Sequence, residues 1–226
     1  MLNTSMLLEL LPKAIVLFTA MPIHECAHGY AAHKLGDNTA RDQGRLTLNP
    51  FAHLDPIGSL MILVAGFGWA RPVPIDTRRF AHPRRDMALS ALAGPLSNLM
   101  LALLTIIVCK LLYTTGLLYR YEAVPVIYFV MLQIVLINLS LAVFNLLPMP
   151  PLDGFKVFGS LLPDKAYFWV LQREHYVSMI ILLIVIVPNV LNFTSPVGFI
   201  IGFFASRLLD VMDFITRPLG PLLIAW

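Results

Sequence analysis

The sequence predicts an all-α polytopic membrane protein. Hydrophobic residues make up 58% of the 226-residue chain and charged residues only 13%, whereas a soluble domain carries nearer 25% charge. Several apolar runs are long enough for a membrane-spanning helix, which takes about 20 residues. No polar linker divides the chain. We therefore expect one membrane-embedded domain over residues 1–226, with a core at about 6–160 and C-terminal helices at about 176–217.

The first apolar segment, residues 6–35, changes character along its length. Its first part is almost purely apolar, and polar residues gather in its second half. Ionisable groups at membrane depth are costly, so they normally face a bundle interior or a wet cavity and mark a functional site. The segment lacks a basic leader, so we expect that it is a spanning helix and not a cleaved signal peptide.

The next apolar run, residues 57–70, is shorter and is interrupted by three glycines. Such a segment more often re-enters the bilayer or lies at its surface than crosses it. Residues 71–76, with two prolines at alternating positions, read as extended chain. We predict a short re-entrant or β-hairpin segment near 57–76. Its extended part is either a rigid proline-punctuated turn, which we favour, or an edge for strand addition by a substrate.

Four further apolar runs follow, and each is long enough to span the bilayer. They cover residues 87–115, 123–148, 176–191 and 197 to about 215. Charged residues and a proline interrupt the last two runs, so the number of spans after residue 160 stays open. The last two runs would be the flanking transmembrane helices.

The arginines orient the predicted bundle. Seven of them lie between the first span and residue 87, and the positive-inside rule places that loop in the cytoplasm. The last two helices would then go out and come back, which leaves the carboxyl terminus and Arg217 inside. The net charge of +3 is modest, and the clustering of basic residues in loops explains it better than nucleic-acid binding does. We therefore expect the lipid bilayer, and no nucleic acid, as a partner.

The polar half of the first segment contains the pentapeptide His24-Glu25-Cys26-Ala27-His28. On a helix, imidazoles four residues apart lie on one face, at a spacing that lets both bind one metal ion. The motif HExxH is typical of zinc metalloproteases, in which the glutamate is the general base on a metal-bound water. We predict one Zn²⁺ per chain, with His24 and His28 as ligands and Glu25 as the catalytic base.

A catalytic zinc commonly has three protein ligands, so a third ligand must come from another segment. Asp153 is our candidate, because broken backbone after Pro148, Pro150 and Pro151 can aim its carboxylate inward. Taken alone, an aspartate before glycine is more often a helix cap or turn residue. Asp153 lies at the same depth in the membrane as His24 and His28 only if residues 57–70 do not span it.

The chain resembles the site-2 protease family of intramembrane zinc metalloproteases, as a short bacterial-type member. The resemblance is carried by His24-Glu25-Cys26-Ala27-His28 and by Asn145, Pro148, Asp153 and Gly154, and it extends to residues 94–98. It implies a three-helix catalytic core at about 6–35, 87–115 and 123–149. We recognise no PDZ or CBS module and no helix before the catalytic one, which leaves the mode of substrate selection open.

The resemblance implies hydrolysis of peptide bonds in or near transmembrane segments of substrate proteins, as in regulated intramembrane proteolysis. From the resemblance together with the arginine pattern, we expect a multi-pass protein of the cell membrane with its active site toward the cytoplasmic side. Asn98 and Asn145 lie in apolar helices, where each is either an oxyanion or substrate-binding group or a polar clamp between helices. His53 is a candidate for a supporting or gating role, or is a loop histidine.

Two other classes of function stay open. A zinc transporter would also place histidine and aspartate inside a bundle, but transporters tend to show internal repeats, and we find none in this sequence. A proteolytically inactive relative that binds membrane helices is the second alternative. Such a protein would not need a general base, so Glu25 favours the protease. The identity of the substrates and the oligomeric state are not readable from the sequence.

Overall fold

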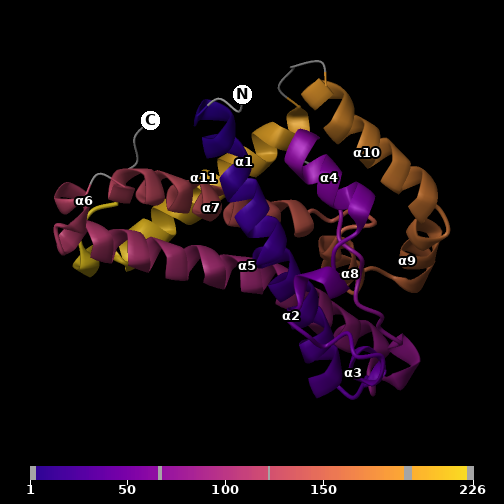
Figure 1. Cartoon of the computed structure of the whole chain (residues 1–226). Helices are drawn as coiled ribbons and strands as arrows, with labels where there is room; N and C mark the ends of the chain where they lie inside the picture. The colour runs from indigo at the N-terminus through magenta and orange to yellow at the C-terminus, as the bar shows by residue number, and fades with distance from the viewer. Residues whose placement is uncertain (1–3, 66–67, 122, 191–194, 223–226) are drawn as a thin grey trace.

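The computed structural model describes residues 4–65, 68–121, 123–190 and 195–222. Within these ranges every regular element is a helix, which confirms the all-α prediction (Figure 1). Three of the helices are long and apolar enough to cross a membrane, and they cover Leu8–Lys34, Pro83–Thr114 and Val124–Asn145. They correspond to the three predicted core helices.

The first predicted helix is broken in two at Thr19. Helix α1 (Thr4–Phe18) and helix α2 (Ala20–Lys34) flank this residue. Pro22 has no N–H to donate to the Phe18 carbonyl, four residues earlier, so the helical ladder is interrupted there. The Thr19 hydroxyl also donates to the Ile15 carbonyl at 2.6 Å, a contact that bends helices. The bend separates the apolar α1 from α2, which carries HExxH.

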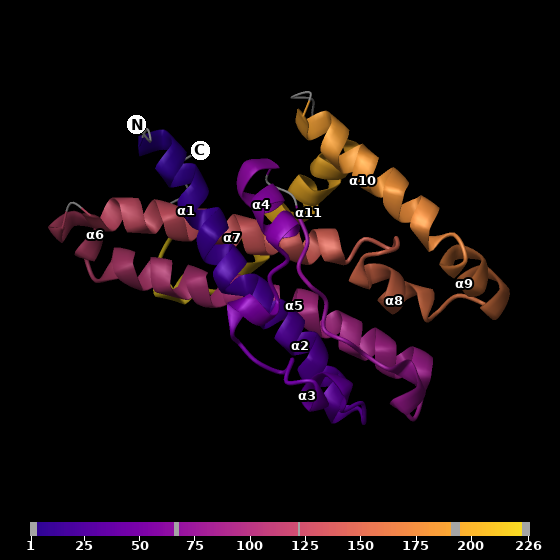
Figure 2. The same ribbon diagram turned by 45° about the vertical axis from the view of Figure 1, so that its right-hand side comes forward.

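Helices α5 (Pro83–Thr114) and α7 (Ala123–Asn145) form an antiparallel pair joined by α6 (Leu117–Arg120). Helix α2 crosses α5, and α1 crosses α7 (Figure 2). Small residues on α5 (Ala91, Gly94 and Ser97) are buried, and small residues allow helix backbones to approach closely. Helix α7 ends at Asn145, because the prolines that follow cannot continue a helix.

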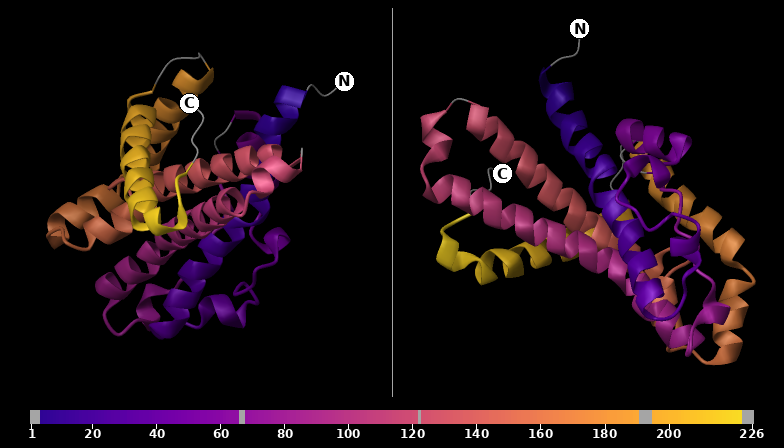
Figure 3. Two further views of the ribbon diagram at one scale, coloured as in Figure 1. Left: turned by 90° about the vertical axis from the view of Figure 1, so that its left-hand side faces the viewer. Right: turned by 60° about the horizontal axis from the view of Figure 1, so that its bottom comes forward.

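Helix α11 (Pro196–Ile215) completes the hydrophobic core against α5 and α7. Its direction contradicts the predicted path. The Lys110 ammonium near the end of α5 pairs with the Asp213 carboxylate at 2.7 Å, and Gly220 lies beside Thr114. Helix α11 therefore runs parallel to α5 and ends near the α5–α7 connection (Figure 3). The prediction that the carboxyl terminus returns to the face holding HExxH is wrong, because α11 runs in the same direction as α5 and ends at the other end of the bundle.

Four shorter helices remain, three between α7 and α11 and one in the predicted re-entrant segment. They are α8 (Asp153–Gly159), α9 (Asp164–Leu171), α10 (Glu174–Val190) and α4 (Pro56–Ala65). A ten-residue helix is about 15 Å long, half the thickness of the hydrocarbon layer. Helix α4 is therefore too short to span, as predicted for residues 57–70.

The chain after α4 is extended and is held by one antiparallel bridge, between Leu54 and Ala70. The Arg71 N–H also donates to the His53 carbonyl at 2.7 Å. The residues that the structure describes contain no paired strands beyond this bridge, so the hairpin alternative is not formed there. The remaining elements are α3 (Thr39–Asp42) and the 3-10 turns η1 (Pro50–Ala52), η2 (Thr77–Arg79) and η3 (Arg217–Leu219).

Candidate active site

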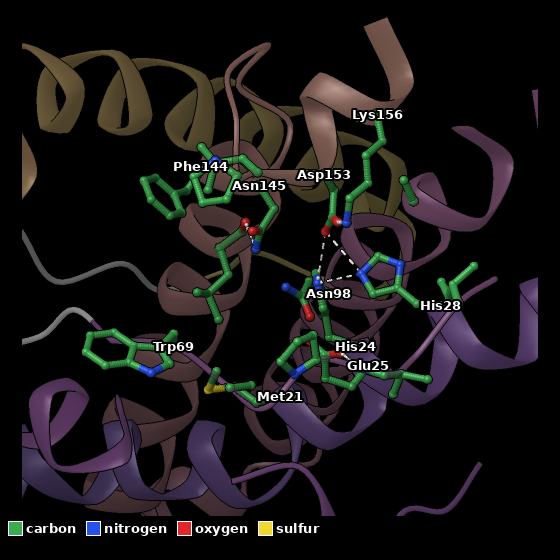
Figure 4. Close-up of a pocket in the computed structure, with 18 of the residues that line it drawn as sticks. Met21, His24, Glu25, His28, Trp69, Asn98, Phe144, Asn145, Asp153 and Lys156 are labelled. Carbon is green, nitrogen blue, oxygen red and sulfur yellow. Dashed lines mark hydrogen bonds and ion pairs between the residues drawn. The ribbon is translucent and has the colours of Figure 1, made fainter. Parts of the chain in front are cut away.

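Three predicted side chains converge where α2, α5 and α8 meet. His24 and His28 lie one turn apart on α2, with their Nε2 atoms 3.0 Å apart. The Asp153 Oδ2 atom lies 3.2 Å from His24 Nε2 and 3.0 Å from His28 Nε2 (Figure 4). All three residues are buried. The structure thus joins residues that are more than a hundred positions apart in the sequence.

The backbone before α8 aims Asp153 at the histidines. Asp153 is the first residue of α8, after the N-cap residue Leu152, and its carboxylate contacts His24, His28 and Lys156. The capping role that is common for Asp before Gly is therefore absent at this residue. A Cβ at Gly154 would collide with the carbonyl oxygens of Leu146 and Leu147, so only glycine lets α8 start this close to the end of α7.

The donor set fits a metal ion. The His28 Nδ1 atom lies 2.8 Å from the Ser90 carbonyl oxygen, and a carbonyl can only accept. Nδ1 must therefore carry the proton, and a neutral His28 directs the Nε2 lone pair at the Asp153 carboxylate. Two acceptors at 3.0 Å repel each other unless a proton or a metal ion lies between them.

The distances are also those of a metal site. Ligand atoms about 2.05 Å from a tetrahedral zinc ion are roughly 3.3 Å apart, close to the 3.0 to 3.2 Å between the three donors. The bond from His28 Nδ1 to Ser90 fixes the tautomer of that ligand, as partners of metal-binding histidines commonly do. His24 Nδ1 is buried and has no hydrogen-bond partner among the described residues.

Gly94 of α5 lies directly against the two imidazole rings. A Cβ at this position would overlap His28 Nε2 and would lie 2.6 Å from His24 Cε1. Glycine is therefore required at this point of close approach between α2 and α5. Residues 94–98 belong to the family resemblance of the sequence, but only the packing shows what Gly94 does.

Glu25 faces the same cavity, which has a volume of about 420 Å³. Its Oε2 atom accepts the backbone N–H of Val73 at 2.9 Å. Its Oε1 atom has no hydrogen bond within the described part of the chain. The extended segment after α4 thus fixes one oxygen of Glu25 and leaves the other available.

Other contacts hold this extended segment against α2. The buried Asp37 carboxylate accepts the Asp76 N–H at 2.7 Å, and Arg45 Nη2 donates to the carbonyls of Arg71 and Pro72 at 3.0 and 3.2 Å. The Arg78 side chain and N–H donate to Asp76 and hold the pKa of that carboxyl below its usual value. Because so many of its backbone groups are occupied, the contacts favour a rigid segment over an open strand edge.

Asn98 and Asn145 both line the cavity. The buried Asn98 Oδ1 atom has no hydrogen-bond partner among the described residues. The Asn145 Nδ2 atom donates to the Leu141 carbonyl of its own helix at 3.0 Å. The Asn145 side-chain donor is therefore used within its own helix, whereas the Asn98 Oδ1 atom can still accept a hydrogen bond from a ligand in the cavity.

His53 does not join this group. Its Nε2 atom donates to the Thr47 carbonyl at 2.8 Å, its side chain is fully buried, and it is not among the residues that line the cavity. Its backbone carbonyl bonds Arg71, so its contact with the site runs through the extended segment. The predicted gating role stays a prediction.

The sequence does not predict a role at the site for two neighbouring residues, Lys156 and Ser90. Lys156 Nζ lies 3.3 Å from Asp153 Oδ1, the oxygen that faces away from the histidines. The spacing of three residues on a short helix is a signal that would have found this pair. Ser90 supports His28 through its backbone carbonyl, a role for which the residue type gives no signal.

A buried His₂Asp set beside a glutamate, between helices that can cross a bilayer, defines a membrane-embedded metallopeptidase. Comparisons with known proteins support this class. A model of peptidase family M50 matches residues 118–188, which include the second motif but not HExxH. YwhC of Bacillus subtilis, named as a candidate zinc metalloprotease, is 43% identical over 80% of this chain and 83% of its own length.

More distant relatives carry the same kind of name. Rip2 proteins of Mycolicibacterium smegmatis and Mycobacterium tuberculosis, also named as candidate zinc metalloproteases, are 27% and 28% identical over 74% of this chain, which spans 63% of their length. No solved structure matches the chain. The chain belongs to peptidase family M50, the site-2 protease family, and is a zinc metallopeptidase.

Proposed function

We propose that this metallopeptidase hydrolyses peptide bonds within or next to transmembrane segments of other membrane proteins, as in regulated intramembrane proteolysis. The observation that carries the proposal is the burial of His24, His28 and Asp153 between helices long enough to span a bilayer. A metal site at that place is reached by a substrate that is itself in the membrane. The arginine-rich loops support a place in the cell membrane with the active site toward the cytoplasm.

In the proposed mechanism, His24, His28 and Asp153 would hold one zinc ion through Nε2, Nε2 and Oδ2. Bound zinc would polarise the scissile carbonyl and lower the pKa of a water molecule. Glu25 takes the proton of that water on Oε1, while the Val73 N–H holds Oε2 and fixes the carboxylate. Glu25 can then deliver the proton to the leaving amine.

Asn98 supplies the remaining polar contact. Its side chain lines the same cavity as His24 (Figure 4), and an amide there can bond the substrate backbone or the developing oxyanion. A transmembrane substrate must unwind locally, because its carbonyls are bonded within the helix. Asn98 and the Asn145 oxygen offer partners to the backbone groups that unwinding sets free.

The proposal is tested by comparing the wild type with Glu25→Gln in detergent and in liposomes. Both proteins should bind about one zinc ion per chain, because Glu25 is not a ligand. Only the wild type should cleave a panel of transmembrane-segment fusions, since loss of a general base costs roughly 100-fold or more in rate. Glu9→Gln is the matched control, because Glu9 lies on α1, pairs with Lys13 and does not line the cavity.

Two results would contradict the proposal. Cleavage by Glu25→Gln at the wild-type rate would remove Glu25 from the mechanism. Zinc binding without cleavage of any fusion in a broad panel would favour a transporter or an inactive binder of membrane helices, and zinc flux into liposomes would then be measured.

A further inference from the structure

A second cavity, of about 270 Å³, lies beside the first one, between the start of α5 and helices α8 and α9. Two cationic side chains, Arg84 and Lys156, line it together with Ser160 and Tyr167. None of the described residues that line it carries a carboxylate. The wall of this cavity thus combines basic and polar side chains with aromatic ones, a composition suited to an anion attached to an apolar group.

Tyr167 and Asp164 hold Arg84 in place, and one nitrogen of its guanidinium can still donate to a ligand. Its guanidinium lies 4.6 Å from the centroid of the Tyr167 ring, and its Nη1 atom lies 2.8 Å from Asp164 Oδ1. Its Nη2 atom is buried and has no acceptor among the described residues. A buried donor without an acceptor indicates a missing ion or water. Asp164 is 80% exposed, so it only partly neutralises Arg84.

The cavity lies at the polar end of a membrane span. Arg84 belongs to the first turn of α5, which is a candidate span from Pro83 to Thr114. Helices α8 and α9 next to it, and the turn between them, expose large apolar side chains: Phe158, Leu161, Phe168, Trp169 and Leu171. Exposed tryptophan and phenylalanine beside basic residues are typical of elements that lie in the membrane interface.

We propose that this cavity binds the phosphate of an anionic phospholipid, with the acyl chains lying over the apolar surface of α8 and α9. Arg84 is the main ligand, through Nη2, and Lys156 adds a second positive charge at the cavity wall. Basic pockets beside transmembrane helices bind anionic headgroups in this way. The exposed apolar side chains favour a lipid over free phosphate, because free phosphate would make no use of them.

The purified full-length protein is titrated with dioctanoyl phosphatidylglycerol and, separately, with dioctanoyl phosphatidylcholine, and bound lipid is counted by native mass spectrometry. The wild type should bind one phosphatidylglycerol in preference to phosphatidylcholine. Arg84→Gln should weaken this binding about fivefold, the effect of one charge near a membrane surface. Arg41→Gln is the matched control, because Arg41 is an exposed arginine on α3, away from the cavity.

Asp164→Asn separates a lipid site from a merely structural ion pair. If Arg84 serves only to hold α9 through Asp164, both variants loosen the same contact and both lower lipid binding. If Arg84 binds the phosphate, loss of the competing carboxylate leaves phosphatidylglycerol binding unchanged or up to about fivefold tighter. Opposite responses of the two variants therefore support the proposal.

Three results would overturn it. They are equal binding of the two lipids, weaker phosphatidylglycerol binding by Asp164→Asn, and displacement of the lipid by an equal concentration of inorganic phosphate. The last result would identify a small phosphate site in place of a lipid site. None of these measurements depends on proteolysis, so the outcome is independent of the proposed function.

Discussion

Replacement of Gly94 by alanine should weaken zinc binding by about 100-fold or more while the protein stays folded. The added Cβ would lie 2.6 Å from His24 Cε1 and closer still to His28 Nε2. Carbon atoms in contact prefer about 3.5 Å or more, so the rings must move by roughly 0.9 Å. Metal ligands tolerate shifts of only about 0.2 Å.

The size of the effect follows from the number of ligands that are displaced. A change in one group that supports a ligand costs about 10- to 100-fold in metal affinity. Here two ligands are pushed aside directly, so the zinc affinity should fall by about 100-fold or more. The helix itself should not suffer, because alanine is a better helix former than glycine by roughly 0.5 to 1 kcal/mol.

The assay is the zinc content of the purified protein after dialysis against a competing chelator, with the melting temperature measured in parallel. Gly202→Ala on α11 is the control, because a Cβ there would meet no atom within 4 Å. That variant should keep its zinc. Stoichiometric zinc in Gly94→Ala, at wild-type affinity, would refute the packing argument and with it the assignment of the two histidines.

Three further predictions concern the scaffold. Asp213→Asn should destabilise the protein by about 3 kcal/mol, because it leaves the fully buried Lys110 ammonium without a counter-charge. Lys110→Met should cost less, since the Asp213 side chain is 43% exposed and can be hydrated. Equal melting temperatures for the two variants would contradict this ranking. Asp37→Ala should cost about 2 to 4 kcal/mol, because it removes three hydrogen bonds to a buried carboxylate, and a change below 1 kcal/mol would show that another group holds the extended segment. Cysteines introduced at Arg41 and Arg217 should be labelled from opposite sides of the membrane, and labelling from one side would refute the direction of α11.

The predicted helices were largely correct, because long apolar runs leave few alternatives in a bilayer. The helix boundaries differ from the predicted ones where a local residue interrupts the helix. The first helix breaks at Thr19 because Pro22 cannot donate a hydrogen bond. The short run at 57–70 was recognised from its length and glycines, but whether the following residues pair or stay extended depends on distant partners such as Glu25 and Asp37.

The path of the last helices was the error of the sequence reading. Counting spans in alternation treats each long helix as one crossing and takes no account of how helices pack. The ion pair between Lys110 and Asp213 and the apolar contacts of α11 with α5 and α7 decide the direction of α11. Neither partner of that pair is identifiable from spacing, because the two residues lie far apart in the sequence.

By itself, the sequence determined the chemistry of the site. The spacing of His24 and His28 places two metal ligands on one face of a helix, with the base Glu25 next to them in the chain, since that geometry is local. Only the tertiary structure decided which other groups complete the site: Asp153 at 3.0 and 3.2 Å, the close approach of Gly94 and the Val73 N–H on Glu25. These contacts join distant segments, and packing alone fixes which distant segments meet.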